Sequence, residues 1–157
     1  MTIQKITPFL WYSNEAEEAA AFYAAIFPDS RVTRVTAVPS AGSTKLVEFV
    51  LFGQPFIAMS AGGADSFNHS ISLMVNCDDQ EELDRYWNAL LEGGGSPDAC
   101  GWLKDRFGVS WQIIPTDQIE MMADPDPAKA RRVAEAMMKM VKLDVAALKA
   151  AYSGTTD

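Results

Sequence analysis

The chain has 157 residues, of which 48% are hydrophobic and 22% are charged, and its formal net charge at pH 7 is −8. This length is sufficient for a single domain, residues 1–157, with its own hydrophobic core. The acidic balance argues against a nucleic-acid surface, because affinity for phosphates comes mainly from clustered Lys and Arg. The one adjacent basic pair is Arg131-Arg132.

The sequence also indicates the cellular compartment of the protein. No apolar run approaches the roughly 20 residues that a membrane-spanning helix needs, and residues 1–5 lack the apolar core of a signal peptide. Two cysteines, Cys77 and Cys100, are typical of free thiols rather than of a disulfide framework. We therefore expect a cytoplasmic protein with no membrane partner.

The first module is predicted over residues 3–60. Its first strand covers residues 3–12, where β-branched, aromatic and apolar residues predominate and Pro8 indicates a sheet edge or a strand start. Alternation along this strand places Phe9 and Trp11 on one face and Pro8, Leu10 and Tyr12 on the other. Both faces are apolar, so we expect both to be covered.

A helix and three further strands follow in this module. Asn14 and Glu17 have the spacing of a capping box at the helix start, and Pro28 ends the helix. Gly53-Gln54 predicts a tight turn between the last two strands. The predicted strands cover residues 31–38, 44–52 and 55–60.

A flexible linker, residues 61–68, leads to a second module at residues 69–116. Its first strand runs from Phe67 to Cys77, and alternation separates Ile71, Leu73 and Val75 from a more polar face of Ser70, Ser72 and Met74. This face suits the wall of a pocket.

The second module also contains a helix and two further strands. Asp78 and Glu81 predict the helix start. The triplet Gly93–Gly95 follows the helix instead of opening one, so it predicts a helix end and not a phosphate-binding loop. The two strands are expected at residues 100–104 and 110–115.

The second module repeats the order of elements of the first, which we interpret as two copies of one β-α-β-β-β unit and which predicts an α+β fold. We expect the two paired modules to form a curled, cup-like mixed sheet, followed by a C-terminal helical extension at residues 124–152. In this extension Asp126 with Pro127 marks one helix start, and Asp144 marks another.

Several runs carry a resemblance to a known family. They are residues 15–19 (EAEEA) with Phe22-Tyr23, Phe27-Pro28, residues 76–82 (NCDDQEE), residues 100–105 (CGWLKD) and residues 111–115 (WQIIP). Together they resemble the PhnB-like branch of the vicinal oxygen chelate superfamily, often labelled demethylubiquinone 3-methyltransferase. The superfamily includes glyoxalase I, extradiol dioxygenases, and fosfomycin- and bleomycin-resistance proteins. The resemblance covers residues 3 to about 152.

The resemblance implies where a metal would be held. Superfamily enzymes hold a divalent metal in the cup through side chains of the first and last strands of the modules. Here those positions fall on Pro8, on Ser70 or His69, and on Gln112. Proline has no ligand atom and an amide is a weak ligand, so we expect no metal and no other cofactor. A divalent metal near His69 and Gln112 is the alternative.

The interior of the cup is the expected ligand site. It combines apolar side chains with a few polar groups, as small-molecule sites do, and the alternative is that these side chains fill the cup themselves. No residue is assigned a catalytic role, because Cys77 and Cys100 fit structural thiols better than nucleophiles paired with His69. The candidate ligand-binding residues are Leu10, Tyr12, His69, Ser70, Ser72, Met74, Trp102 and Gln112.

Three functions remain open. The first is a metal-free protein that binds a small molecule, as the bleomycin-resistance relatives do. The second is a metal-dependent lyase, isomerase or dioxygenase of the same superfamily. The third is a methyltransferase, as the family label states, although no glycine-rich strand–turn–helix motif for a nucleotide-like cofactor is found. The resemblance also implies a homodimer, because such cups are often completed between subunits.

Overall fold

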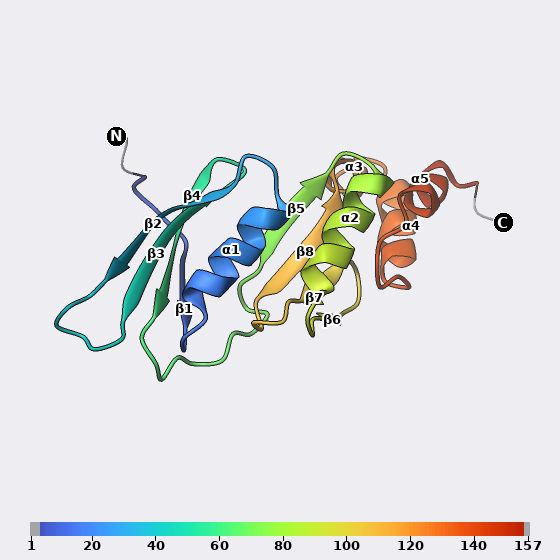
Figure 1. The fold of residues 1–157 in the computed structure, drawn as a ribbon. Helices are drawn as coiled ribbons and strands as arrows, with labels where there is room; N and C mark the ends of the chain where they lie inside the picture. The colour runs from blue at the N-terminus through green and yellow to red at the C-terminus, as the bar shows by residue number, and fades with distance from the viewer. Residues whose placement is uncertain (1–3, 156–157) are drawn as a thin grey trace. The chain divides into compact units, whose positions relative to one another are not determined.

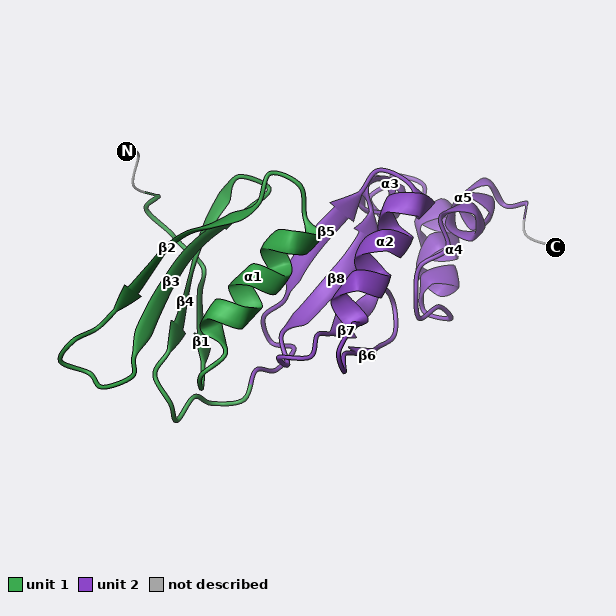
Figure 2. Ribbon diagram, viewed as in Figure 1, with its two compact units in different colours: residues 1–66 green, residues 67–157 purple. Residues whose placement is uncertain are grey.

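The computed structural model describes residues 4–155, and the chain divides into two compact units (Figure 2). Unit 1 comprises residues 1–66 and unit 2 comprises residues 67–157. The boundary between them falls inside the linker expected at residues 61–68. Each unit contains a four-stranded mixed sheet that stays open, which confirms the α+β class. No helix in the described part of the chain is long and apolar enough to cross a membrane.

Unit 1 has the predicted order of one strand, one helix and three strands (Figure 1). The strands lie in the order β1-β4-β3-β2, and the pair β1–β4 is parallel while the other pairs are antiparallel. The elements are β1 (Phe9–Tyr12), α1 (Ala16–Ile26), β2 (Arg31–Ala37), β3 (Lys45–Leu51) and β4 (Gln54–Ser60).

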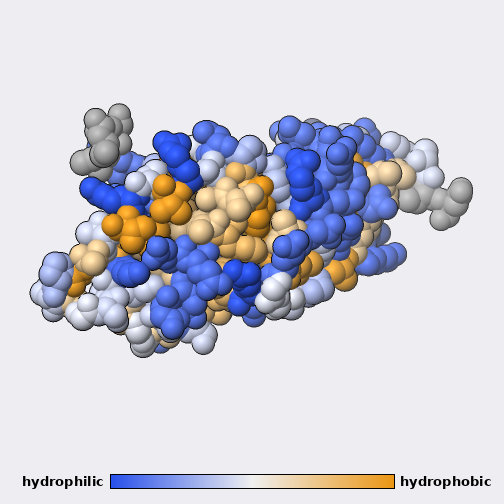
Figure 3. Space-filling view, in the orientation of Figure 1, coloured by the Kyte–Doolittle hydropathy of each residue, from blue (hydrophilic) through white to orange (hydrophobic). Residues whose placement is uncertain are grey.

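One face of this sheet packs against α1 and forms the core of unit 1. Tyr23 of α1 is fully buried and lies beside Phe49 of β3, whose ring stacks on Phe56 of β4. Small side chains such as Ala19 and Ala20 allow the helix to approach the sheet closely. Exposed positions of α1 also include alanines, and Figure 3 accordingly shows pale orange atoms over this helix and mainly hydrophilic ones over the helix of unit 2.

The start of α1 differs from the prediction. Glu15 occupies the N-cap position and makes no side-chain capping bond, so the capping box of Asn14 and Glu17 is wrong. The free backbone N–H of Ala16 is instead satisfied by the hydroxyl of Ser60, at 2.9 Å in the buried interior. A residue 44 positions away in the sequence thus does what a local cap normally does.

The turn between β3 and β4 is centred one residue earlier than predicted. Phe52 and Gly53 both have positive φ, of 50° and 74°, as a two-residue turn between twisted strands requires. A phenylalanine is unusual in this conformation. Its backbone N–H donates to the Ser30 hydroxyl at 3.0 Å, and its ring packs on Phe27. These contacts hold Phe52 in the turn.

Unit 2 repeats the arrangement around a second helix, with strand order β5-β8-β7-β6 and a parallel pair β5–β8. The strand expected from Phe67 begins only at Leu73, and the short strand β6 was not predicted. The elements are β5 (Leu73–Cys77), α2 (Gln80–Leu91), β6 (Ser96–Pro97), β7 (Trp102–Lys104) and β8 (Ser110–Pro115).

A capping box begins α2, but it is shifted by one residue from the predicted Asp78 and Glu81. The Asp79 carboxylate accepts from the backbone N–H of Glu82 at 2.8 Å, and the Glu82 carboxylate accepts from the backbone N–H of Asp78 at 2.6 Å. The aspartates at 78 and 79 have the same chemistry, so the pattern alone did not distinguish them.

Three helices follow β8: two lie in the extension predicted at residues 124–152, and one precedes that range. The latter, α3 (Thr116–Met122), follows β8 directly. The capping predictions for the others are confirmed, because Asp126 precedes α4 (Pro127–Met137) and accepts from Ala128 N, and Asp144 precedes α5 (Val145–Ser153) and accepts from Ala147 N.

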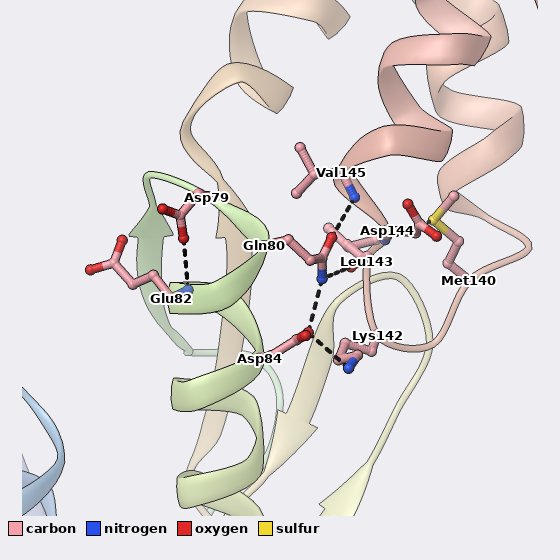
Figure 4. A network of polar contacts seen from close by, with 9 residues as sticks. All are labelled: Asp79, Gln80, Glu82, Asp84, Met140, Lys142, Leu143, Asp144 and Val145. Carbon is pink, nitrogen blue, oxygen red and sulfur yellow. Dashed lines mark hydrogen bonds and ion pairs between the residues drawn. The ribbon is translucent and has the colours of Figure 1, made fainter.

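A polar network fastens this extension to α2 (Figure 4). The Gln80 amide accepts from Val145 N at 2.7 Å and donates to the Leu143 carbonyl at 3.1 Å and to Asp84 at 2.9 Å. Lys142 forms an ion pair with Asp84 at 2.8 Å. One glutamine side chain therefore joins the first turn of α2 to the start of α5.

Candidate functional site

The candidate site lies on the face of the unit 2 sheet that is turned away from α2, which we call the distal face. Val75, Trp111 and Ile113 are buried on the α2 side of the sheet. Side chains alternate along each strand, so their neighbours point the other way. Backbone pairing aligns Met74 of β5 with Gln112 of β8, and Gln112 with Trp102 of β7. These three predicted site residues therefore form one row across three strands.

A fourth predicted residue is bonded to this row. The Gln112 Nε2 donates to the Ser72 hydroxyl at 2.9 Å, which fixes the orientation of the amide. Met74 is 46% exposed, while Trp102 and Gln112 are half-buried. An aromatic ring, a thioether and an oriented amide thus lie side by side on a surface that a ligand can reach. The structure thus places four of the predicted site residues, Ser72, Met74, Trp102 and Gln112, beside one another.

A buried carboxylate supports the hairpin that carries Trp102 and Gln112. Asp105, 3% exposed, lies in the turn between β7 and β8. One of its oxygens accepts from the backbone N–H groups of Phe107 and Val109, and the other accepts from the indole N–H of Trp111 at 2.8 Å. This residue was absent from the predicted site. The sequence signal was an aspartate followed three residues later by Gly108, the pattern of a tight turn.

Leu10 and Tyr12 do not lie on an open face, which corrects the expectation that they line a cup. They are 8% and 2% exposed, and the Tyr12 hydroxyl is 3.1 Å from that of Tyr23 on α1. Both therefore belong to the helix–sheet core of unit 1. Their neighbours Phe9 and Trp11, 51% and 47% exposed, occupy the face turned away from α1. Because both sets are apolar, alternation alone could not determine which set faces the helix.

His69 and Ser70 precede β5 instead of belonging to it. Both are exposed and lie in a turn, where the Asn68 side chain accepts from Ser70 N at 2.8 Å. They therefore lie before the strand that carries Met74, and they do not belong to the row formed by Met74, Gln112 and Trp102. Ile71 is also outside the strand and is 72% exposed.

Two other titratable candidates are already engaged. Glu48 forms an ion pair with Arg34 of the neighbouring strand, and the hydrogen bond from this guanidinium lowers the pKa of the Glu48 carboxyl. Cys77 is fully buried, and burial together with the nearby charges of Glu82 and Asp78 raises the pKa of its thiol to about 12. Cys77 is therefore a protonated structural thiol, as expected.

A cleft of about 600 Å³ lies in the C-terminal extension, away from every predicted site residue. Two of its three carboxylates have partners: Asp117 pairs with Lys149 at 3.1 Å, and Asp124 accepts from the Tyr152 hydroxyl at 2.5 Å. That hydrogen bond lowers the pKa of Asp124 and raises that of Tyr152. The lining residues are Asp117, Glu120, Met121, Ala123, Asp124, Pro125, Lys149, Tyr152 and Ser153.

The side chains at the positions where superfamily enzymes hold a metal do not fit one. Pro8 offers only its backbone carbonyl, which already accepts from Ile57 N at 3.0 Å. Gln112 offers only a neutral amide oxygen, which is a weak ligand, and His69 stands in an exposed turn. Within residues 4–155, no three His, Cys, Asp or Glu side chains come together as a metal would need.

Comparisons with known proteins identify the family. The model of the family described as 3-demethylubiquinone-9 3-methyltransferase matches residues 4–114. The structure is similar to that of the PhnB protein of Bacillus cereus, described under the same activity, with 31% sequence identity and a TM-score of 0.65. This match covers 71% of the present chain and 99% of the Bacillus protein. Comparison with curated proteins gave no match.

More distant structures share the fold. A Pseudomonas aeruginosa protein matches at 22% identity and a TM-score of 0.55, over 70% of this chain and 95% of that one. The fosfomycin resistance protein FosX of Listeria monocytogenes, complexed with Mn(II) in one structure, matches at 15% identity and a TM-score of 0.51, over 70% and 90% of the two chains. The chain belongs to the PhnB-like family described as 3-demethylubiquinone-9 3-methyltransferase, within the vicinal oxygen chelate superfamily.

Proposed function

We propose that this protein binds a small organic molecule on the distal face of unit 2 and that it does so without a metal. The observation that carries the proposal is the row of Met74, Gln112 and Trp102, in which an accessible aromatic ring stands beside an amide oriented by Ser72. Apolar surface with a few fixed polar groups is the usual composition of a small-molecule site. The bound molecule would contact the Trp102 ring and the free oxygen of the Gln112 amide.

The side chains at the positions where relatives bind a metal support a metal-free site. The position that provides a carboxylate in metal-dependent relatives is Gln112 here, and a neutral amide oxygen is a weaker ligand than a carboxylate. A methyltransferase activity has less support, because each sheet is mixed and contains one parallel pair, unlike the doubly wound parallel sheet that binds nucleotide-like cofactors. Binding, without an assigned reaction, is the function that these residues support best.

The test is a site-resolved ligand screen. A library of planar organic fragments is added to ¹⁵N-labelled protein, and backbone amide shifts are followed with EDTA present throughout. We expect saturable shifts at Met74, Trp102 and Gln112 that are lost in Trp102→Ala and retained in Trp11→Ala, which changes an exposed tryptophan of unit 1. Shifts confined to the cleft of the C-terminal extension, or no saturable shifts, would overturn the proposal.

The metal-free part has its own measurement. Protein purified without an affinity tag is offered Zn, Mn, Fe, Ni and Co and analysed by mass spectrometry, beside His69→Ala and Gln112→Ala. We expect sub-stoichiometric metal in all three proteins. Near-stoichiometric metal that disappears in either variant would contradict the metal-free site and favour the metal-dependent lyase, isomerase or dioxygenase.

We also propose that the protein forms a homodimer. In the described sheets, β1 and β5 each have a strand neighbour on one side only, and unpaired edges tend to associate. The exposed rings of Phe9 and Trp11 add apolar surface close to one of these edges. Light scattering should give the mass of two chains for the wild type and of one chain for Trp11→Glu. A wild-type mass of one chain at 100 µM would contradict the dimer.

A cytoplasmic location is part of the same proposal. Cys77 and Cys100 are free thiols, which is the usual state of cysteine in a reducing compartment. Fractionation of cells that produce the protein should find it with cytoplasmic markers, and recovery in a secreted or membrane fraction would contradict this location.

A further inference from the structure

The distal face of unit 2 carries a positive charge next to its aromatic ring. Lys104 is two residues after Trp102 on β7, so both side chains emerge on the same face, with their Cα atoms about 6.6 Å apart along the strand. Backbone pairing places Lys104 between Ser110 of β8 and Ser96 of β6. The residues that flank this lysine across the sheet are therefore neutral.

The ammonium group of Lys104 has no counter-ion. Lys104 is exposed, and no described residue forms an ion pair or side-chain hydrogen bond with it. The adjacent Asp105 points to the opposite face, where its carboxylate is held by Trp111. Asp98 follows β6 and lies opposite Trp102, because its backbone N–H donates to the Trp102 carbonyl at 2.8 Å; its negatively charged carboxylate accepts from Ala99 N at 2.7 Å and forms no ion pair with Lys104. In a chain of net charge −8, an unpaired lysine beside an accessible indole is a distinctive arrangement.

Three hydrogen-bond donors lie on this face, beside the acceptor oxygens of Gln112 and Asp98. The indole N–H of Trp102 has no partner among the described residues. The Ser72 hydroxyl accepts from Gln112 and retains its own hydrogen for donation. Together with the ammonium of Lys104, these groups present donors around a flat apolar ring. A complementary ligand combines a planar ring with an oxygen acceptor that carries negative charge.

We infer that the distal face of unit 2 selects planar aromatic molecules that carry an anionic oxygen group, with the ring against Trp102 and the anion beside Lys104. This inference rests on the proposed function, because it assigns a chemical class to the same surface. Trp102 supplies the contact that any flat apolar molecule would make. Lys104 supplies the preference for an anion, which in this exposed setting is modest and screened by salt.

The experiment compares two fluorescent probes that share one ring system. 8-Anilino-1-naphthalenesulfonate carries a sulfonate, and N-phenyl-1-naphthylamine is its neutral counterpart. Both are titrated into the wild type, Lys104→Glu, Trp102→Ala and the control Lys139→Glu, which makes the same change in net charge on an exposed lysine after α4. Circular dichroism verifies that each variant is folded.

The expected result separates the contribution of the Lys104 charge to probe binding from that of the Trp102 ring. Lys104→Glu should weaken binding of the sulfonate by up to about fivefold, a ratio that shrinks in 0.5 M NaCl, and should leave the neutral probe unchanged. Lys139→Glu should alter neither probe, and Trp102→Ala should weaken both.

Two results would count against the proposals, and they can be told apart. If Trp102→Ala weakens both probes while Lys104→Glu affects neither, the binding surface stands and the selection for anions is overturned. If Trp102→Ala also has no effect, the surface is not the binding site, and the proposed function falls together with the inference.

Discussion

The indole Nε1 of Trp111 donates to Asp105 Oδ2 over 2.8 Å, and both residues are almost fully buried. The tryptophan lies on the α2 side of β8, and the aspartate occupies the turn that leads into that strand. This single bond therefore connects the hydrophobic core of unit 2 to the hairpin whose other face carries Trp102 and Gln112. The rigidity of the candidate site depends on a contact made on the opposite side of the sheet.

Replacing Asp105 should destabilise the protein strongly. Asp105→Ala leaves three N–H groups without their acceptor in a buried turn, and we expect a loss of about 2–4 kcal/mol in the free energy of unfolding. Urea unfolding followed by tryptophan fluorescence measures it. Asp98→Ala, which removes an exposed carboxylate, is the control and should stay within about 0.5 kcal/mol of the wild type. Similar unfolding midpoints for the two variants would contradict the role given to Asp105.

Ser60, not Asn14, should stabilise the start of α1. Ser60→Ala removes the acceptor for the buried N–H of Ala16, and we expect a loss of about 1–2 kcal/mol in the free energy of unfolding. Asn14→Ala should cost less than about 0.5 kcal/mol, because Asn14 is exposed and does not cap the helix. Chemical denaturation of the two variants compares them directly, and the reverse ranking would restore the local capping box.

Cys77 should make the protein less stable in alkaline solution. Its thiol has a pKa of about 12 in the folded protein against an ordinary value of 9.0. Between these values the unfolded chain loses the proton while the folded chain keeps it, so stability falls as the pH rises above about 9. Thermal melts at pH 8 and pH 10 should show a smaller decrease for Cys77→Ala than for the wild type. Equal decreases would contradict the raised pKa.

Gln80 should control the attachment of the C-terminal extension. In Gln80→Ala the backbone N–H of Val145 and the carbonyl of Leu143 lose their side-chain partner. We expect hydrogen exchange of α5 amides to accelerate about tenfold, which corresponds to about 1.4 kcal/mol, without a change in α1. Asn88→Ala, an exposed change on the same helix, is the matched control. Unchanged protection of the α5 amides in Gln80→Ala would show that packing alone holds α5 in place.

The repeat and most of its strands could be predicted from the sequence because they rest on local signals. Residues 110–115 read as a strand and form one, and Asp126 with Pro127 starts a helix as its chemistry dictates. The start of α1 could not be predicted in this way, since its capping group comes from Ser60 at the far end of the module. A local sequence pattern identifies a helix or strand more reliably than it identifies the distant residue that caps it.

The residues of the candidate site likewise divide into those that a local pattern places and those that it does not. Alternation placed Ser72 and Met74 on the face away from the core, because the opposite face of that strand is uniformly apolar and only one face could enter the core. In β1 both faces are apolar, and Leu10 and Tyr12 were assigned to the wrong side. Lys104 was not among the predicted site residues, because the anion preference that we propose for it depends on cross-strand neighbours that the sequence does not order.

The link between the extension and the hairpin of the site is made by main-chain atoms. The backbone N–H groups of Cys100 and Gly101 donate to the carbonyls of Met140 and Val141, each at 2.8 Å. These two bonds use no side-chain atom of Met140 or Val141, so substitutions there leave both bonds in place, and a change at Met140 removes only the contact of its sulfur with Asp144 N, at 3.5 Å. Gly101 has no such freedom, because a methyl group there would meet Leu143 at 2.9 Å and the Ile113 carbonyl at 3.1 Å, at a φ of 82°. One side of the connection therefore tolerates other side chains, whereas the other side requires glycine.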